Sequence, residues 1–228
     1  MRTESITIPV DGAAVESVQG IFQVPARGTP CKQALLLAHG AGASMQADFM
    51  EAMAKGLVLR GHPVLRFRYA YMERAAREGR RFPPDRVPLL EMVHRAALET
   101  LRRKTSDERV VLAGKSMGGR ISSHLAAAGE VCDGLIYLGY PLHPAKKPEK
   151  LRSQHFPEIR QRSLFLQGTR DALCGLHLLQ TELKKYQGPH QVQVIEGADH
   201  AFHVLKRSGR TDAEVEQQLL QTMQDWLS

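Results

Sequence analysis

The sequence predicts an α/β protein, in which a mostly parallel, twisted β-sheet carries helices on both of its faces. Short apolar runs of strand length alternate along the chain with longer segments whose apolar residues recur at helical spacing. Strands that alternate with helices form parallel sheets, because each helix carries the chain back across one face. The 228 residues, 43% hydrophobic and 24% charged, suit one soluble domain spanning residues 1–228.

The strands follow from short runs of apolar and β-branched residues. The expected strands are residues 5–10, 15–24, 33–38, 63–69, 109–113, 134–138, 163–167 and 191–195. The first two are expected to form a hairpin around a turn at Asp11 and Gly12, because this pair favours tight turns. Residues 33–38 and 109–113 are almost entirely apolar, which indicates central strands buried on both faces. Residues 191–195 instead alternate polar and apolar side chains.

The helices follow from apolar stripes at a spacing of three and four residues. The expected helices are residues 48–60, 88–104, 120–128, 176–186 and 215–227. In the first of them, Phe49, Met53 and Leu57 share one face with their apolar neighbours. Each helix lies between two predicted strands or closes the chain, so the pattern is that of a helix-covered sheet.

The segment Gly114–Gly119 carries the most chemical information in the chain. It fits the pattern G-x-S-x-G, between a predicted buried strand and a predicted helix. In that context the serine stands on a tight turn, and glycines flank it because side chains do not fit there. Ser116 is therefore the expected nucleophile, at the positive end of the following helix. The alternative is a chance match in which Ser116 only caps the helix.

Two more residues are needed to activate a serine hydroxyl, and in this architecture the acid precedes the histidine in the chain. Asp171 follows the predicted strand 163–167 within a turn, which places it at the carboxyl end of the sheet. His200 follows the last predicted strand in a loop. Asp171 is the expected acid and His200 the expected base, although an aspartate in a turn is also common for structural reasons.

Three other residues compete for these two roles. Asp199 is the neighbour of His200, and adjacent loop side chains rarely face each other. Asp133 precedes a predicted strand, which puts it at the wrong end of the sheet. His203 is the alternative base if the loop is helical, and loop position favours His200 over it.

A glycine-rich loop follows the predicted strand 33–38. Its sequence is His39-Gly40-Ala41-Gly42, a pattern that supplies a backbone N–H to a developing oxyanion. Ala41 is the expected donor, with Gly42 as the alternative, and the N–H of Met117 is the expected second donor. The side chain of His39 is expected to be structural. A phosphate-binding loop is not expected, because the upstream glycine that this loop requires before Gly114-Lys115-Ser116 is missing.

The segment 139–161 interrupts the alternation of strands and helices. It is rich in proline and basic residues and follows the strand after Ser116, where related enzymes carry a lid. Its length allows one short helix near residues 149–152 and no separate cap domain. The active site is therefore expected to be shallow and open. His143 and Tyr140 are candidates to line it, but the favoured interpretation is that they are surface loop residues.

Charge is concentrated in part of the chain. The net charge is +7 and the isoelectric point about 9.5. Between Arg66 and Arg86 stand seven arginines, namely Arg66, Arg68, Arg74, Arg77, Arg80, Arg81 and Arg86, against Glu73, Glu78 and Asp85. One interpretation is attraction of an acidic substrate or polyanion; the favoured one is an internally paired, solvated loop. Nucleic acid is not expected as a partner, because aromatic residues are not interleaved with the basic ones.

The expected cellular compartment follows from the apolar segments and the cysteines of the chain. Apolar runs stay far below the ~18 residues of a membrane span, and the first residues hold no apolar signal segment. Cys31, Cys132 and Cys174 are scattered and odd in number, which indicates free thiols in the cytoplasm. The sequence implies no metal or organic cofactor, and it does not indicate an oligomeric state.

Taken together, these motifs resemble the α/β-hydrolase superfamily over nearly the whole chain. The likeness is carried by residues 39–42, 67–69, 84–86, 114–119, 139–144, 167–171 and 197–202. The chain is most similar to small, lidless members related to dienelactone hydrolases, and among them to a group that includes a testis-expressed mammalian protein. The resemblance implies Ser116 as nucleophile, Asp171 as acid and His200 as base. Dienelactone hydrolases use a cysteine nucleophile, so their substrate is not carried over.

The expected function is therefore a serine hydrolase that cleaves small carboxylic esters or thioesters through a Ser-His-Asp triad. Acyl transfer or perhydrolysis would use the same residues, whereas a peptidase is less expected because no long lid selects peptides. The alternative from another class is a non-catalytic binding or scaffold module on a hydrolase fold, which the basic surface and the missing lid would suit.

Overall fold

The computed structural model describes residues 1–11, 15–27, 29, 33–105 and 109–228. Within these ranges the strands are β1 (Arg2–Pro9), β2 (Ser17–Val24), β3 (Ala34–Ala38), β4 (Val64–Phe67), β5 (Val110–Lys115), β6 (Gly134–Leu138), β7 (Ser163–Gly168) and β8 (His190–Ile195). The helices are α1 (Asp48–Leu59), α2 (Ala70–Glu78), α3 (Val87–Thr105), α4 (Met117–Ala127), α5 (Leu176–Leu183) and α6 (Asp212–Leu227), with 3₁₀ turns η1 (Phe156–Glu158) and η2 (Lys206–Ser208).

All of these strands form one sheet in the order β1-β2-β4-β3-β5-β6-β7-β8. β1 pairs antiparallel with β2, and β2 antiparallel with β4, while every pair from β4 to β8 is parallel. The mostly parallel sheet predicted from the sequence is confirmed, and so is its N-terminal hairpin. Gly12 of the predicted hairpin turn lies outside the described residues.

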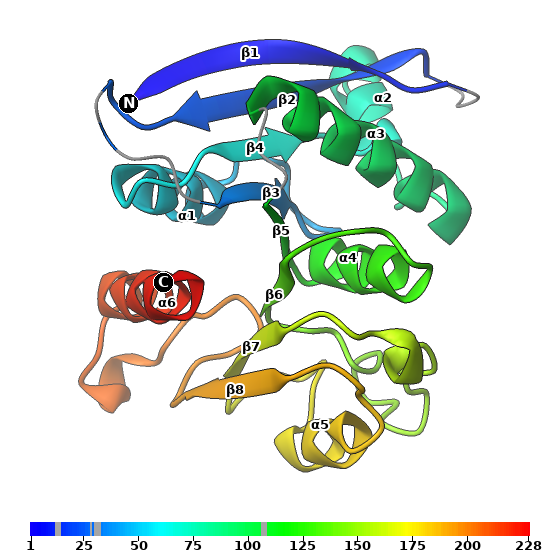
Figure 1. Cartoon of the computed structure of the whole chain (residues 1–228). Helices are drawn as coiled ribbons and strands as arrows, with labels where there is room; N and C mark the ends of the chain where they lie inside the picture. The colour runs from blue at the N-terminus through cyan, green and yellow to red at the C-terminus, as the bar shows by residue number, and fades with distance from the viewer. Residues whose placement is uncertain (12–14, 28, 30–32, 106–108) are drawn as a thin grey trace.

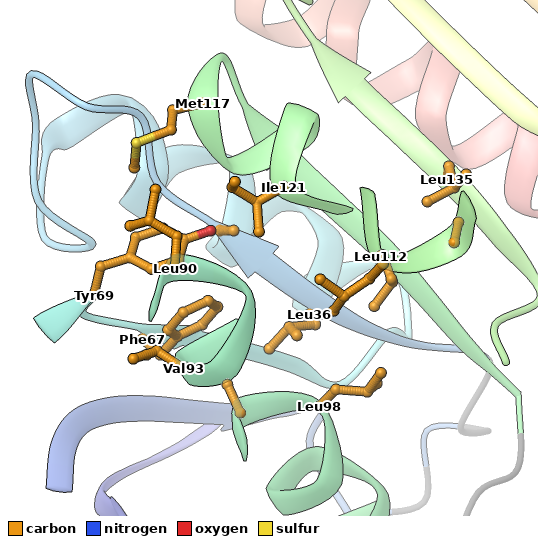
Figure 2. Packing of buried hydrophobic residues seen from close by; sticks show 14 of the residues in the cluster. Leu36, Phe67, Tyr69, Leu90, Val93, Leu98, Leu112, Met117, Ile121 and Leu135 are labelled. Atoms are coloured by element: carbon orange, nitrogen blue, oxygen red, sulfur yellow. The ribbon is translucent and has the colours of Figure 1, made fainter. Parts of the chain in front are cut away.

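Helices cover both faces of the sheet, as Figure 1 shows: α1 and α6 lie on one face, and α3, α4 and α5 on the other. The central strands β3 and β6 are buried along their whole length, and β5 is buried up to Gly114, because successive side chains enter opposite layers. Leu36 and Leu112 pack against α3 and α4, as Figure 2 shows, whereas Leu35 and Val111 belong to the layer beneath α1 and α6. Burial on both faces explains the uninterrupted apolar runs.

The strand order places a crevice at the carboxyl ends of two neighbouring strands. The chain passes from β3 to β4 on one side and then returns to β5 on the other, so Ala38 of β3 pairs with both Phe67 and Gly114. In open α/β sheets, loops that diverge at such a switch of direction leave room for a ligand. The loop after β3 and the turn after β5 face each other at this point.

Two local predictions were wrong. The sequence predicts a solvated loop after β4, but Ala70–Glu78 forms α2, which ends at Gly79 in the left-handed conformation. Residues 149–152, predicted as a short helix, form none. The N–H of Arg152 donates to the carbonyl of Leu142 at 2.8 Å, so a contact with the start of the same segment replaces the helical partner.

The segment between β6 and β7 contains only the 3₁₀ turn η1 as regular structure, and Phe156 of that turn is buried in the core. Over the described part of the chain there is thus no separate cap domain above the sheet. No helix among the described residues is both long and apolar enough to cross a membrane. Cys132 and Cys174 are free thiols, and Cys31 is outside the described residues.

Candidate active site

The turn between β5 and α4 carries Ser116 in a strained conformation. Its φ of 51° and ψ of −114° lie in a region that residues with a side chain rarely adopt. The turn is tight because backbones approach closely around it. A Cβ on Gly114 would lie 2.3 Å from the nitrogen of Gly119, and one on Gly118 would lie 2.4 Å from the carbonyl oxygen of Ala38. The glycines of the motif therefore let the elbow press against β3.

The structure brings the three predicted side chains together, although they lie far apart in the sequence. Nε2 of His200 lies 2.8 Å from Oγ of Ser116. Nδ1 of the same ring lies 2.7 Å from Oδ2 of Asp171. Asp171 follows β7 and His200 follows β8, so both loops leave the sheet at the carboxyl edge where Ser116 stands. The imidazole thus bridges the hydroxyl and the carboxylate in one hydrogen-bonded line.

The carboxylate of Asp171 is fully buried and receives further hydrogen bonds. The amide Nε2 of Gln167 donates to Oδ2 at 2.5 Å, and the N–H of Leu173 donates to Oδ1 at 2.7 Å. The side chain of Asp171 has 0% exposure, while that of His200 keeps 26%. Buried charge needs such donors, because water no longer solvates it. These hydrogen bonds therefore hold the carboxylate of Asp171 in place, whereas the imidazole of His200 remains partly exposed.

Gln167 was missed by the sequence reasoning, although a signal for it exists. It is a polar residue near the end of the apolar strand β7 and is buried at 0% exposure. Its Oε1 accepts a hydrogen bond from the N–H of Tyr140 at 2.9 Å, while its Nε2 binds Asp171. A buried amide is normally satisfied on both ends. Gln167 thus links the end of β6 to the carboxylate.

The competing residues are placed elsewhere. Oδ1 of Asp199 accepts from the N–H groups of Ala201 and His203, which shapes the loop around His200. Nδ1 of His203 lies 2.8 Å from Oδ2 of Asp212, at the start of α6 and not beside Ser116. Asp133 directly precedes β6, and its N–H donates to the carbonyl of Val110, at the opposite edge of the sheet. Neither alternative carboxylate, nor the alternative histidine, joins the line.

Lys115 is a second residue that the sequence reasoning left without a role. Its Nζ donates to the carbonyl oxygen of His200 and lies 5.2 Å from the centre of the Phe202 ring. Burial lowers the pKa of Lys115 to about 8, against the raising effect of Asp171 and Asp199. Phe202 itself has a positive φ of 66°. The side chain of Lys115 thus connects the loop that carries His200 to the end of β5, directly before Ser116.

A cavity of about 420 Å³ opens beside Ser116. Its lining is mostly apolar and comprises Gly40, Ala41, Gly42, Ala43, Ala47, Phe49, Met50, Lys115, Ser116, Leu173, His200 and Ala201. Ala41 and Gly42, the two alternatives for the oxyanion donor, both lie in this wall. Met117 opens α4, and the first N–H groups of a helix have no carbonyl partner within it. Its side chain points away, into the core shown in Figure 2.

His39 is buried, and both nitrogens of its ring form hydrogen bonds with backbone groups. Nδ1 lies 2.7 Å from the carbonyl oxygen of Gly40, and Nε2 accepts from the N–H of Tyr69 at 3.3 Å. These contacts require a neutral ring with the proton on Nδ1. Burial lowers the pKa of His39 to about 4, which keeps the ring neutral. The ring thus serves the structure of the loop, in the way that the sequence indicated.

Neither Tyr140 nor His143 lines the cavity or lies on the surface. Tyr140 is fully buried in the core. His143 is also buried, and its Nε2 accepts from the N–H of Gly175 at 3.1 Å. Both residues begin the segment after β6, which folds back onto the core and so takes these side chains inward.

The arginine-rich segment is largely paired. Arg66 lies within β4 at 3% exposure, bonds the carbonyl of Met45 and Oε1 of Gln23, and faces Glu51 at 3.5 Å. Further ion pairs join Arg68 to Glu73, Arg74 to Asp85, and Arg77 and Arg80 to Glu78. This arrangement matches the internally paired interpretation of the segment.

Comparisons with known proteins agree with this architecture. The family model of an alpha/beta hydrolase domain matches residues 31–228. Among solved structures, dienelactone hydrolase from Anabaena variabilis ATCC 29413 shares 19% identity at a TM-score of 0.76, over 99% of this chain and 96% of that one. An alpha-beta serine hydrolase homologue from Coxiella burnetii shares 20% identity at a TM-score of 0.74, over 97% and 98%.

A third similar structure comes from Xanthomonas campestris and is described as a serine hydrolase without lid. It shares 19% identity at a TM-score of 0.71, over 99% of this chain and 96% of that one. At these identities the structures establish the fold, and they match the lidless, dienelactone-hydrolase-related architecture expected from the sequence. With its sheet order, its elbow at the carboxyl edge and the match over residues 31–228, the chain belongs to the α/β-hydrolase family.

Proposed function

We propose that this protein is a cytoplasmic serine hydrolase that cleaves small carboxylic esters or thioesters, with Ser116 as nucleophile, His200 as base and Asp171 as acid. The observation that carries the proposal is the hydrogen-bonded line at 2.8 Å and 2.7 Å through the His200 ring. The free thiols Cys132 and Cys174 suit a reducing compartment.

The proposed reaction proceeds in two halves. His200 Nε2 takes the proton of Ser116 as Oγ bonds to the carbonyl carbon, and the carbonyl π electrons move onto oxygen. When the tetrahedral intermediate collapses, its C–O or C–S bond breaks, and His200 returns the proton to the departing alcohol or thiol. Water then repeats the sequence on the acyl-enzyme and releases the acid. Asp171 holds Nδ1–H and stabilises the imidazolium in both halves.

The charge that develops on the carbonyl oxygen is assigned to two backbone donors. The N–H of Met117, at the start of α4, adds the favourable end of the helix dipole. The N–H of Ala41 belongs to the loop that lines the cavity opposite the elbow. Removing one such donor from a hydrolase costs about 3 kcal/mol of transition-state stabilisation.

The cavity supports a small, apolar acyl or alcohol group as substrate. Phe49 and Met50 of α1 and Leu173 form its apolar walls, and about 420 Å³ is near the lower end of small-molecule pockets. Phe49 stacks on Phe202 at 5.7 Å between ring centres, so this wall is continuous with the His200 loop.

Labelling with a fluorophosphonate probe tests the proposal, with a mass readout of the modified peptide. Wild-type protein should label at Ser116, and Ser116→Ala should not label. Ser123→Ala is the matched control, because Ser123 Oγ lies 2.7 Å from a different histidine, His155, yet is buried in the core. It should label like wild type.

Hydrolysis of p-nitrophenyl acetate and of a short acyl thioester should then follow the same pattern among the variants. If folded wild-type protein neither labels nor turns over these compounds, the enzyme proposal fails. The binding-module alternative would then be the better account of the fold.

A further inference from the structure

The hydroxyl of Tyr71 lies beneath the loop that carries the proposed oxyanion donor. It stands 3.2 Å from the carbonyl oxygen of Ala41 and 3.4 Å from that of Gly40, and it donates toward both. Tyr71 comes from the first turn of α2 and has 0% exposure. It is not among the residues that line the cavity. The hydroxyl therefore contacts the loop from the side opposite to the substrate.

These two carbonyls control the direction of the neighbouring N–H groups. A trans peptide unit is planar, and its C=O and N–H point in opposite directions. The carbonyl of Gly40 shares a peptide plane with the N–H of Ala41, and the carbonyl of Ala41 shares one with the N–H of Gly42. A donor that draws both carbonyls inward thus turns both N–H groups outward. The same contact serves whichever of the two N–H groups binds the oxyanion.

Contacts of both its backbone and its ring hold Tyr71 in place. Its N–H donates to Oδ2 of Asp85 at 2.8 Å, and Oδ1 of the same carboxylate binds the guanidinium of Arg74 at 2.5 Å. Its ring stacks on Tyr69 at 6.4 Å between centres. Burial raises the pKa of Tyr71, with a further contribution from Asp85, so the hydroxyl keeps its proton at physiological pH.

We propose that Tyr71 is a positioning residue that orients the N–H groups of the loop 40–42 toward the oxyanion. The inference rests on the proposed hydrolase function. It also gives part of the arginine-rich segment a structural role, because the Arg74–Asp85 pair anchors Tyr71. His39 holds the carbonyl of Gly40 as well, at 2.7 Å, but Tyr71 is the side chain that reaches both carbonyls.

Tyr71→Phe removes only the hydroxyl, and Tyr69→Phe is the matched control. Tyr69 is equally buried and stacked on the same ring, but its hydroxyl binds Nδ1 of His94 at 2.9 Å and not the loop. We expect Tyr71→Phe to lower kcat on p-nitrophenyl acetate by about 10- to 100-fold with KM within about twofold, because misplaced donors act on the transition state. A trifluoromethyl ketone adds to Oγ of Ser116, and its former carbonyl oxygen becomes an oxyanion in the adduct. The affinity for this ketone should fall by a similar factor.

Tyr69→Phe should leave both kcat and the affinity for the ketone unchanged, even where it lowers the melting temperature. Equal kinetics of the two variants would overturn the proposal. If Tyr71→Phe does not fold, Asp85→Asn replaces it: this variant keeps the hydroxyl but loosens its anchor, and it should show the same defect at smaller size. Unchanged kinetics of Asp85→Asn would also overturn it. Wild-type labelling at Ser116 separates these outcomes from failure of the hydrolase proposal.

Discussion

Lys115 and His200, 85 positions apart in the chain, are joined by a hydrogen bond from the ammonium group to the backbone carbonyl. Lys115 is the last residue of β5, directly before Ser116. The bond therefore ties the loop of the proposed base to the strand of the proposed nucleophile. The distance between Oγ of Ser116 and Nε2 of His200 depends on the positions of both elements. The contact between Lys115 and His200 therefore helps to set this distance, although Lys115 takes no part in the proposed reaction.

Lys115→Met should reduce the rate of fluorophosphonate labelling about tenfold, because the His200 loop loses its anchor and small misplacements of reacting groups cost much rate. The melting temperature should change little, since the variant also removes the cost of burying a charge, visible in the lowered pKa of Lys115. Lys115→Gln keeps a donor and should restore part of the rate. Equal labelling rates for Lys115→Met and wild type would contradict the assignment.

Gln167→Leu should lower both activity and stability. The change removes one donor from the carboxylate of Asp171 and leaves the N–H of Tyr140 without its acceptor. An unsatisfied buried group of this kind costs about 1–3 kcal/mol in the free energy of unfolding. Urea denaturation and the rate of probe labelling measure the two effects. Gln191→Leu, at an exposed position of β8, is the control and should alter neither.

Gly118→Ala should destabilise the protein by roughly 1–3 kcal/mol or more, because the new Cβ would meet the carbonyl oxygen of Ala38 at 2.4 Å. The elbow must then move away from β3, so probe labelling at Ser116 should also fall. Gly42→Ala meets no atom within 4 Å, and the free energy of unfolding of this variant should stay at or above that of wild type. Thermal denaturation distinguishes the two, and equal losses would refute the close-approach argument.

Stability should decline as the pH falls from about 6.5 toward 4. Burial lowers the pKa of His39 to about 4 and that of His94 to about 3, from an ordinary value of 6.5. In this window the unfolded chain binds protons that the folded protein excludes, so each histidine costs about 1.4 kcal/mol per pH unit. Urea denaturation of His94→Gln between pH 7 and 4.5 should give a shallower slope than wild type. An unchanged slope would show that His94 does not carry this dependence.

Binding to heparin should be weak and should vary little with salt. Much of the arginine-rich segment is already paired with carboxylates, and Arg66 is buried, so few cations of this segment remain to displace counterions from a polyanion. Heparin chromatography over a salt gradient measures this directly. Steep, salt-dependent retention would revive the polyanion interpretation.

The sequence by itself determined the sheet, its helical layers and the order of the chemical residues. These features are local in the sequence. Apolar runs indicate strands buried on both faces, and G-x-S-x-G between a strand and a helix predicts Ser116 as the nucleophile without reference to any distant residue. Asp171 and His200 could be named because the loops after parallel strands share one edge of the sheet. The helix α2 could not be predicted, because four of its nine residues are charged and its buried positions are confined to the first turn.

Only the tertiary structure decided how the site is supported. Lys115 and Tyr71 each contact a residue that is distant in the chain, and Gln167 connects Asp171, four residues further on, to the distant Tyr140. No local pattern encodes such distant partners. The same holds for residues 149–152, where a bond from Arg152 to Leu142 replaced the predicted helix. Local sequence sets which residues have suitable chemistry, whereas the packing of separate loops at one sheet edge sets which of them meet.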